Sequence, residues 1–269
     1  MKHLMLMIPK WRCSSVKSSN WTVSFNPVQP NPDDNVLTCG PHHSEIIKAM
    51  KPDVVVYANL GCTEREFDEW DKPQGPKYIT WSTDSYRHTQ RCTTSDLHLS
   101  SIPDTVEKSD IFVPLWHDHH MRPNLSRDYT VGMCARPHML GNRQELIADA
   151  QAKVNGLHLN QSNIHVGAYI DEIKRYRYGL NISIYPNGLP NFRNFELGAC
   201  GVMPVCKRQV YDLSALFDGH IRLYDHIEEV NHIVEDTYHA ESLQEYYQEK
   251  HSLMARLRYI MGLVGEDFK

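Results

Sequence analysis

The chain has 269 residues, of which 41% are hydrophobic and 23% charged, and its formal net charge is −5 at pH 7. This composition is ordinary for a soluble globular protein, and the length suits two domains that each bury a core. The acidic balance argues against a strongly cationic nucleic-acid binder. Seven scattered cysteines without a C-x-x-C pair argue against a disulfide framework and a structural zinc site, so we expect reduced thiols and a cytoplasmic location, which for a viral protein is the host cytoplasm.

The first half of the chain alternates apolar runs with helical or loop segments. Its first apolar run is too short for a signal peptide or a membrane span. Ser44–Met50 predicts a helix with Ser44 as its N-cap, and Lys51-Pro52 ends it. Arg12–Asp34 is predicted to be mostly loop, in which W-T-V-S-F is compatible with an irregular edge strand. The predicted strands are Leu4–Ile8, Val36–Cys39, Val54–Ala58, Tyr78–Ser82 and Ile111–Leu115.

The second half repeats this alternation after a short segment without periodicity, Pro123–Ser126. We take that segment as a linker and expect domains over residues 1–125 and 126–269. Glu241–Leu263 predicts one long helix or a helix pair. Because strands alternate with helices throughout, the expected fold class is α/β with parallel sheets. The predicted strands are Tyr129–Cys134, Ile164–Val166, Leu180–Tyr185, Val202–Cys206 and Ile221–Tyr224.

The most informative segment is Asn187–Gly201, N-G-L-P-N-F-R-N-F-E-L-G-A-C-G, which lies between two predicted strands. It predicts a loop that opens into a short helix and ends at Cys200-Gly201. Helix N-termini at the carboxyl ends of parallel strands bind anions, because unpaired N–H groups and the positive end of the dipole point outward there. Arg193 and Glu196 are three residues apart and so share one helix face. An arginine suits a phosphate and a carboxylate suits the hydroxyls of a ribose.

The motif R-x-F-E-x-x-A-C-G resembles the donor-site motif of glycosyltransferases with the GT-B architecture, in particular the spore-coat-maturation type related to the group 1 enzymes. A weaker similarity extends over Asp128–Met261. The resemblance implies that Glu196 binds the donor ribose and that the flanking residues, Asn187, Asn194 and Phe195, approach the phosphates. Group 1 enzymes carry a further Glu eight residues earlier, where this chain has Gly188, so the sugar-contacting role of that residue does not transfer.

The resemblance also implies a fold and an activity. We expect two facing Rossmann-like domains with the site in the cleft between them, and a last helix that packs back on the first domain. The expected reaction moves a sugar from a nucleotide-diphosphate sugar, a UDP-sugar first of all, to an acceptor hydroxyl. No D-x-D motif occurs in the sequence, which fits a fold that binds the diphosphate without an obligatory metal or other cofactor.

Several basic residues are candidates for binding the donor. Arg136 and Arg143 follow the first strand of the second domain, where open α/β sheets bind ligands, and would neutralise the diphosphate. The alternative is that they are solvated arginines near a helix start. Lys174 and Arg177 lie in Tyr169–Tyr178, which borders the nucleotide base in the resembling family. The alternative is that these charged side chains only face solvent, because helical phasing places Ile173 and Tyr176 or Arg177 on one face.

A base that activates the acceptor is sought after the strands of the first domain. Asp84 follows a strong strand and is the first candidate, with a turn-forming aspartate as the alternative. His42 and His43 are rivals from another loop. The run from His117 to His120 suggests a metal, but consecutive residues rarely converge on one ion. We therefore expect no metal site there and place His117 at the cleft edge.

The acceptor is expected to be a saccharide or another small molecule. Phage DNA glucosyltransferases share the GT-B architecture, and the basic and aromatic residues in Tyr86–Arg91 suit DNA phosphates and bases, so hydroxymethylated bases in DNA are the alternative acceptor. A non-catalytic nucleotide-sugar binding module is the alternative from another class, because Gly188 replaces the usual sugar-contacting Glu.

Overall fold

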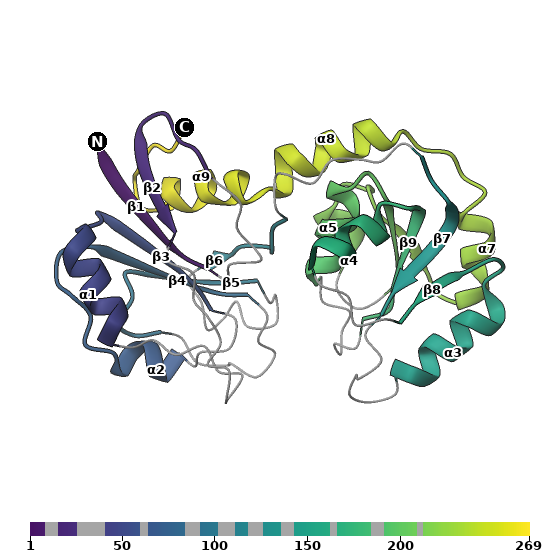
Figure 1. Ribbon diagram of the computed structural model, residues 1–269, viewed down its shortest axis with the longest axis horizontal. Helices are drawn as coiled ribbons and strands as arrows, with labels where there is room; N and C mark the ends of the chain where they lie inside the picture. The colour runs from purple at the N-terminus through teal and green to yellow at the C-terminus, as the bar shows by residue number, and fades with distance from the viewer. Residues whose placement is uncertain are drawn as a thin grey trace. The chain divides into compact units, whose positions relative to one another are not determined.

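The computed structural model describes residues 1–8, 16–25, 41–59, 64–83, 92–101, 111–117, 126–135, 143–161, 166–183, 191–208 and 212–269. The chain divides into two compact units (Figure 1). The first unit contains Met1–Leu115 together with Leu253–Lys269, and the second contains Trp116–Ser252. None of the helices in these described ranges is long and apolar enough to cross a membrane.

The first unit contains a parallel sheet in the order β2-β1-β3-β4-β5-β6. Its core is built from the apolar side chains of the central strands, which lie against Ile47 and Phe67 of the helices α1 (Pro41–Met50) and α2 (Glu64–Glu69). The near-continuous burial of the inner strands is typical of parallel sheets covered on both faces. The strands are β1 (Lys2–Met7), β2 (Trp21–Phe25), β3 (Val54–Asn59), β4 (Lys77–Ser82), β5 (Leu97–Ser100) and β6 (Ile111–Phe112).

Most predicted elements of the first unit are present, and W-T-V-S-F is the edge strand β2. Strand β5 was missed and β6 keeps only two of its five predicted residues, while Val36–Cys39 lies outside the described residues. The N-cap prediction for Ser44 is wrong, because α1 already begins at Pro41 and proline is favoured in the first helical turn. Inside the helix, the Ser44 hydroxyl accepts a hydrogen bond from Trp70 Nε1 at 2.8 Å.

The second unit contains a five-stranded parallel sheet in the order β11-β10-β9-β7-β8. Strands and helices alternate along its chain, as expected for an α/β unit. Its strands are β7 (Tyr129–Cys134), β8 (His158–Asn160), β9 (Tyr176–Asn181), β10 (Met203–Lys207) and β11 (Arg222–Tyr224). Its helices are α3 (Arg143–Lys153), α4 (Val166–Ile173), α5 (Phe192–Ala199), α6 (Leu213–Leu216), the 3-10 helix η4 (Ile227–Glu229), α7 (Val230–Ile233) and α8 (Ala240–His251).

Two predictions for the second unit are wrong, and the strand predicted at Leu180–Tyr185 corresponds to β9, which begins and ends four residues earlier at Tyr176–Asn181. A strand was predicted at Ile164–Val166, but Val166 begins α4 and the strand that pairs with β7 is β8. The helical phasing across Tyr169–Tyr178 ends at Ile173, because Tyr176 and Arg177 belong to β9. The tyrosines and isoleucines of this stretch suit either period, so its pattern alone does not show where the helix ends.

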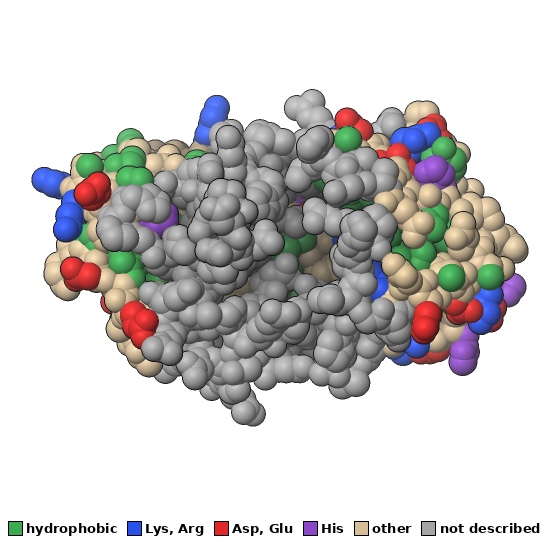
Figure 2. Space-filling view, turned by 60° about the horizontal axis from the view of Figure 1, so that its bottom comes forward, with side chains coloured by type: hydrophobic (Ala, Val, Ile, Leu, Met, Phe, Trp, Pro, Cys, Tyr) green, Lys and Arg blue, Asp and Glu red, His purple; other side chains and the backbone are tan. Residues whose placement is uncertain are grey.

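The segment predicted as one helix or a helix pair is a pair. Helix α8 ends at His251, Ser252 is extended, and α9 (Leu253–Leu263) belongs to the first unit. Acidic and basic side chains are interspersed on the described surface of both units in the view of Figure 2. The described part of this face therefore shows no strongly cationic surface.

Candidate functional site

Helix α5 begins at the edge of the second sheet where β9 ends. Its N-cap is Asn191, whose side-chain oxygen accepts a hydrogen bond from the backbone N–H of Arg193 at 3.0 Å. This contact satisfies one of the N–H groups that a helix start leaves without an intrahelical partner. The helix closes at the C-cap Cys200, as the sequence predicted.

A cluster of asparagines fixes this helix start to the strand. Asn181, the last residue of β9, donates through Nδ2 to Asn191 Oδ1 at 3.0 Å and also to Asn194 Oδ1. Asn194 is 1% exposed and its Oδ1 also accepts from the Cys206 thiol at 3.4 Å. Asn194 therefore lies in the interior and holds α5 in place.

Arg193 and Glu196 are linked through a third side chain, Tyr169 of α4. Arg193 Nε donates to the Tyr169 hydroxyl at 3.3 Å, and that hydroxyl donates to Glu196 Oε2 at 3.0 Å. The guanidinium also lies 5.9 Å from the centre of the tyrosine ring. The two residues that the sequence singled out thus share one polar group at the carboxyl edge of the sheet.

The protonation of this group follows from its surroundings. Burial raises the pKa of Tyr169 well above its usual value, and the Glu196 carboxylate raises it further. Burial lowers the pKa of Arg193, but contact with Tyr169 and Glu196 outweighs it and leaves that pKa above its usual value. The tyrosine is therefore neutral and the arginine charged at physiological pH.

The structure places other predicted residues less directly. Arg143 is the first residue of α3, after β7, and is 4% exposed. Phe195 is buried between the rings of Phe217 and His251, at 5.1 Å and 5.4 Å, so it belongs to the core. Arg136, Asn187, Asp84 and the side chain of His42 lie outside the described residues.

Two histidines named as candidates are buried. His43 is 2% exposed and its ring lies 6.2 Å from that of Trp70, beside the core of the first unit. His117 is 1% exposed, and its Nε2 lies 2.9 Å from the backbone oxygen of Tyr247. Because a carbonyl only accepts, Nε2 carries a proton in this contact. No group of His, Cys, Asp and Glu able to hold a metal occurs among the residues that the structure describes.

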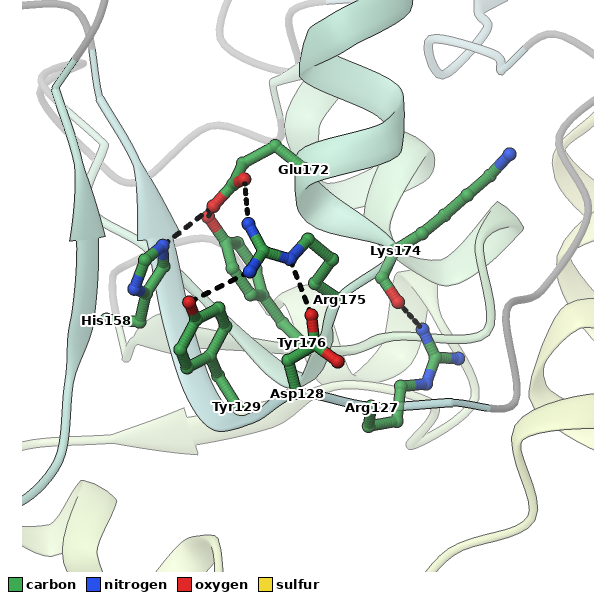
Figure 3. A network of polar contacts seen from close by, with 8 residues as sticks. All are labelled: Arg127, Asp128, Tyr129, His158, Glu172, Lys174, Arg175 and Tyr176. Carbon is green, nitrogen blue, oxygen red and sulfur yellow. Dashed lines mark hydrogen bonds and ion pairs between the residues drawn. The ribbon is translucent and has the colours of Figure 1, made fainter.

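Lys174 and Arg177 lie at the opposite edge of the sheet, where β9 begins. Arg177 donates to the backbone oxygen of Asp236 at 2.8 Å. The Lys174 side chain points away from the polar network beside it, and its backbone oxygen accepts from Arg127 (Figure 3). The Arg177 side chain therefore bonds to Asp236 and makes no hydrogen bond to Arg193 or Glu196 among the described residues.

The polar network at this edge of the sheet, where the strands begin, was not predicted from the sequence. Its centre is Glu172, 7% exposed, whose carboxylate accepts from Tyr176 at 2.6 Å, Arg175 at 3.0 Å and His158 at 2.8 Å (Figure 3). Arg175 also donates to Asp128 at 2.7 Å. These bonds tie the end of α4 to the first residues of three strands, so the network supports the fold.

Arg127 stabilises the same edge. Its guanidinium donates to the backbone oxygens of Cys200 at 3.1 Å and Gly201 at 3.0 Å, just after α5 ends. Cations are favoured at a helix C-terminus, where carbonyls lack intrahelical partners. Arg127 therefore fixes the far end of the helix that carries Arg193.

Replacing Glu172 by glutamine is expected to lower the free energy of unfolding by about 1–3 kcal/mol, because an amide then faces buried donors. Burial raises the pKa of Glu172, but the hydrogen bonds from Tyr176, His158 and Arg175 outweigh it and leave that pKa below its usual value. The stabilisation is therefore complete above the unfolded-state pKa and lost as pH falls through the folded-state value.

Urea denaturation at several pH values from about 7 to about 3 checks this expectation. Wild type should lose stability in acid more steeply than Glu172→Gln. Asp128→Asn is the matched control, since Asp128 is 48% exposed and its pair with Arg175 should contribute less than about 1 kcal/mol. Equal acid slopes in wild type and Glu172→Gln would contradict the assignment.

Comparison with known proteins points in the same direction as the motif. Residues 138–262 match the family model described as glycosyl transferase-like. No curated protein matches the sequence. The solved structure of AviGT4, a glycosyltransferase involved in avilamycin A biosynthesis, has a TM-score of 0.60 at 11% identity and covers 100% of this chain and 99% of its own.

Two further relatives share the fold. An alpha-glucosyltransferase in complex with UDP has a TM-score of 0.55 at 10% identity, covering 99% of this chain and 100% of its own. A structure of alpha-glucosyltransferase in complex with UDP and a 13-mer DNA that contains an HMU base has a TM-score of 0.51 at 10% identity and the same coverage of both chains. TarM has a TM-score of 0.54 at 10% identity and covers 82% of this chain, which spans only 57% of TarM.

At such low identity these structures show only that the fold is shared. The family model identifies residues 138–262 as a glycosyl transferase-like domain. The expected α/β class with two Rossmann-like units is confirmed by both parallel sheets and by these relatives. Residues 138–262 therefore match a glycosyl transferase-like domain, and the chain has the fold of these glycosyltransferase structures.

Proposed function

We propose that the protein transfers a sugar from a UDP-sugar to the hydroxyl of a saccharide or small-molecule acceptor, and that Arg193 and Glu196 bind the donor. The observation that carries this proposal is the group formed by Arg193, Tyr169 and Glu196 at the start of α5. It joins a cation, a carboxylate and a helix N-terminus at the carboxyl edge of a parallel sheet, where open α/β folds bind nucleotides.

Each member of the group suits one part of the donor. Arg193 uses Nε for Tyr169, so its two Nη groups are the ones that can meet the diphosphate oxygens. The Glu196 carboxylate suits the ribose hydroxyls, which are donors. The diphosphate gains charge as its bond to the sugar breaks, and a fixed guanidinium with a helix N-terminus stabilises that charge. Catalysis then consists of positioning and electrostatic stabilisation.

Other residues complete the proposal from the sequence. Arg136, Arg143 and Asn187 remain candidates for the diphosphate, with Arg143 at the start of α3. Asp84 remains the proposed acceptor-activating base, with His42 and His43 as rivals. Because Arg177 and His117 make contacts away from the proposed donor group, we leave them out of the site, whereas Lys174 remains a candidate beside the nucleotide base.

Replacing Glu196 by alanine is expected to weaken UDP binding by about 10- to 100-fold, because hydrogen bonds to a charged group contribute about 1.5–3 kcal/mol each. Calorimetric titration measures the affinity, and circular dichroism checks the fold. Glu228→Ala is the matched control, since Glu228 is an exposed carboxylate of the same unit that pairs with Lys153. Unchanged UDP affinity in Glu196→Ala would refute the assignment of Glu196 to the donor.

Hydroxymethylated DNA is the second candidate acceptor. It is supported by the likeness in fold to the alpha-glucosyltransferase bound to UDP and DNA, and opposed by the formal net charge of −5. Assays of transfer and donor hydrolysis with a panel of UDP-sugars distinguish the candidate functions when the acceptor is a saccharide, hydroxymethylated DNA or absent. Transfer to DNA alone would replace the small-molecule proposal. Binding without transfer or donor hydrolysis would favour the non-catalytic binding module.

A further inference from the structure

We infer that Tyr169 is a positioning residue of the donor site, which orients the Glu196 carboxylate and thereby selects ribonucleotides over deoxyribonucleotides. The inference rests on the proposed function, because it assigns a role at the same donor site. No sequence motif marks Tyr169, which is 24 residues before Arg193 and 27 before Glu196 in the chain. Its role follows from where α4 places its hydroxyl group.

The direction of the hydrogen bonds is fixed by chemistry. A guanidinium has only donors, so the Tyr169 oxygen accepts from Arg193 Nε. The hydroxyl has one proton, and an ionised carboxylate has only acceptors, so this proton goes to Glu196 Oε2. The chain of bonds therefore runs one way, from Arg193 through Tyr169 to Glu196, and each bond polarises the next.

The tyrosine ring is held independently of a ligand. Tyr169 packs against the buried cluster that contains Ile173, Tyr176 and Leu197. Its hydroxyl therefore presents a fixed donor, and the carboxylate bonded to it loses rotational freedom before any nucleotide arrives. A side chain ordered in advance costs less conformational entropy on binding. The high pKa of Tyr169 keeps the proton on this hydroxyl over the range in which enzymes are assayed.

A consequence for specificity follows from the carboxylate's position. With Oε2 held by Tyr169, the acceptor directions of Glu196 are set, and a ribose with hydroxyls in the matching places gains charge-assisted hydrogen bonds. A 2′-deoxyribose or 3′-deoxyribose lacks one of these donors. Without the tyrosine hydroxyl, the carboxylate loses one of the bonds that orient it, and this discrimination weakens.

The second unit contains a matched control for the experiment. Tyr176 donates to Glu172 at 2.6 Å, so it also forms a tyrosine–glutamate hydrogen bond, at the opposite edge of the sheet from Glu196 (Figure 3). Tyr176→Phe removes one such bond without touching the group around Glu196. A loss that comes only from general destabilisation would then be similar in Tyr169→Phe and Tyr176→Phe.

The test measures the affinities of UDP, 2′-deoxy-UDP and 3′-deoxy-UDP by calorimetry for wild type, Tyr169→Phe, Glu196→Gln, the Tyr169→Phe/Glu196→Gln double variant and Tyr176→Phe. Wild type is expected to prefer UDP to at least one deoxy ligand by about 10-fold or more. Tyr169→Phe should reduce this preference to within about 3-fold, and adding it to Glu196→Gln should change the preference no further. Tyr176→Phe should keep the wild-type preference and lose only thermal stability.

Each outcome decides between the two levels of the proposal. If Tyr169→Phe keeps the wild-type preference for ribose, the positioning role is overturned while the donor site stands. If wild type binds no nucleoside diphosphate, the proposed function fails and the inference fails with it. If Tyr169→Phe does not fold, Tyr169→Leu removes the hydroxyl with a smaller apolar side chain, and a wild-type preference lost in that variant supports the role whereas an unaltered one overturns it.

Discussion

Replacing Arg193 by alanine is expected to lower the rate of sugar transfer at saturating donor by about 10²–10³-fold, the loss that follows removal of one stabilising group from a developing negative charge. The affinity for UMP should change by less than about 3-fold, because the effect arises where charge accumulates during the reaction. Arg193 is placed for this role by the N-cap Asn191 and by its bond to Tyr169.

Steady-state kinetics with the UDP-sugar identified by the donor panel, together with titrations of UMP and UDP, test this expectation. Arg177→Ala is the matched control, since Arg177 lies where β9 begins and donates to the backbone oxygen of Asp236. That variant should keep transfer within about 3-fold of wild type. If Arg193→Ala weakened UMP and UDP binding equally and left the turnover rate unchanged, Arg193 would not act on the diphosphate.

The helix that carries Arg193 was predictable because its signals are local. Gly, Pro and Asn residues precede it in the sequence, Asn191 caps it and Gly201 follows its last turn with φ of 66°. The parallel α/β class also follows from the alternation of strands and helices along the chain. For these reasons the motif located both the helix and the residues on its first two turns.

The partners of these residues could not be predicted in the same way. Tyr169 and Arg127 contact α5 from far along the chain, and hydrogen bonds between distant side chains leave no periodic pattern in a sequence. Strands β5 and β8 have only four and three residues, so their runs are too short to show a strand period. Ser44 had the residue type of an N-cap, yet Pro41 starts the helix one turn earlier.

The position of α5 also depends on close packing at two glycines. A Cβ on Gly179 of β9 would lie 2.3 Å from a methyl carbon of Leu197, and a Cβ on Gly198 would lie 2.3 Å from the ring of Tyr247 in α8. Both distances are far below the 3.5–4.0 Å of ordinary carbon contacts. The absence of side chains at these glycines lets α5 lie against β9 on one side and α8 on the other.

Replacing Gly198 by alanine is therefore expected to lower the free energy of unfolding by about 2–3 kcal/mol, a value typical of overpacking in a core. The gain of about 1 kcal/mol in helix propensity offsets only part of the clash. Tyr247 cannot readily move away, because it is fully buried, its ring is stacked 5.5 Å from that of Phe217, and its hydroxyl donates to the His220 carbonyl at 3.1 Å.

Urea denaturation of Gly198→Ala measures this loss, and Gly262→Ala in α9 is the matched control. A Cβ on Gly262 meets nothing within 4 Å among the residues that the structure describes, so that variant should be as stable as wild type or more stable by up to about 1 kcal/mol. The UDP affinity of folded Gly198→Ala, measured by titration, then shows whether the clash disturbs Arg193 and Glu196. Since a shift of α5 moves Arg193 and Glu196 relative to Tyr169, we expect weaker binding; wild-type affinity in a destabilised variant would show that the N-cap and the asparagine cluster hold the helix start without help from α8.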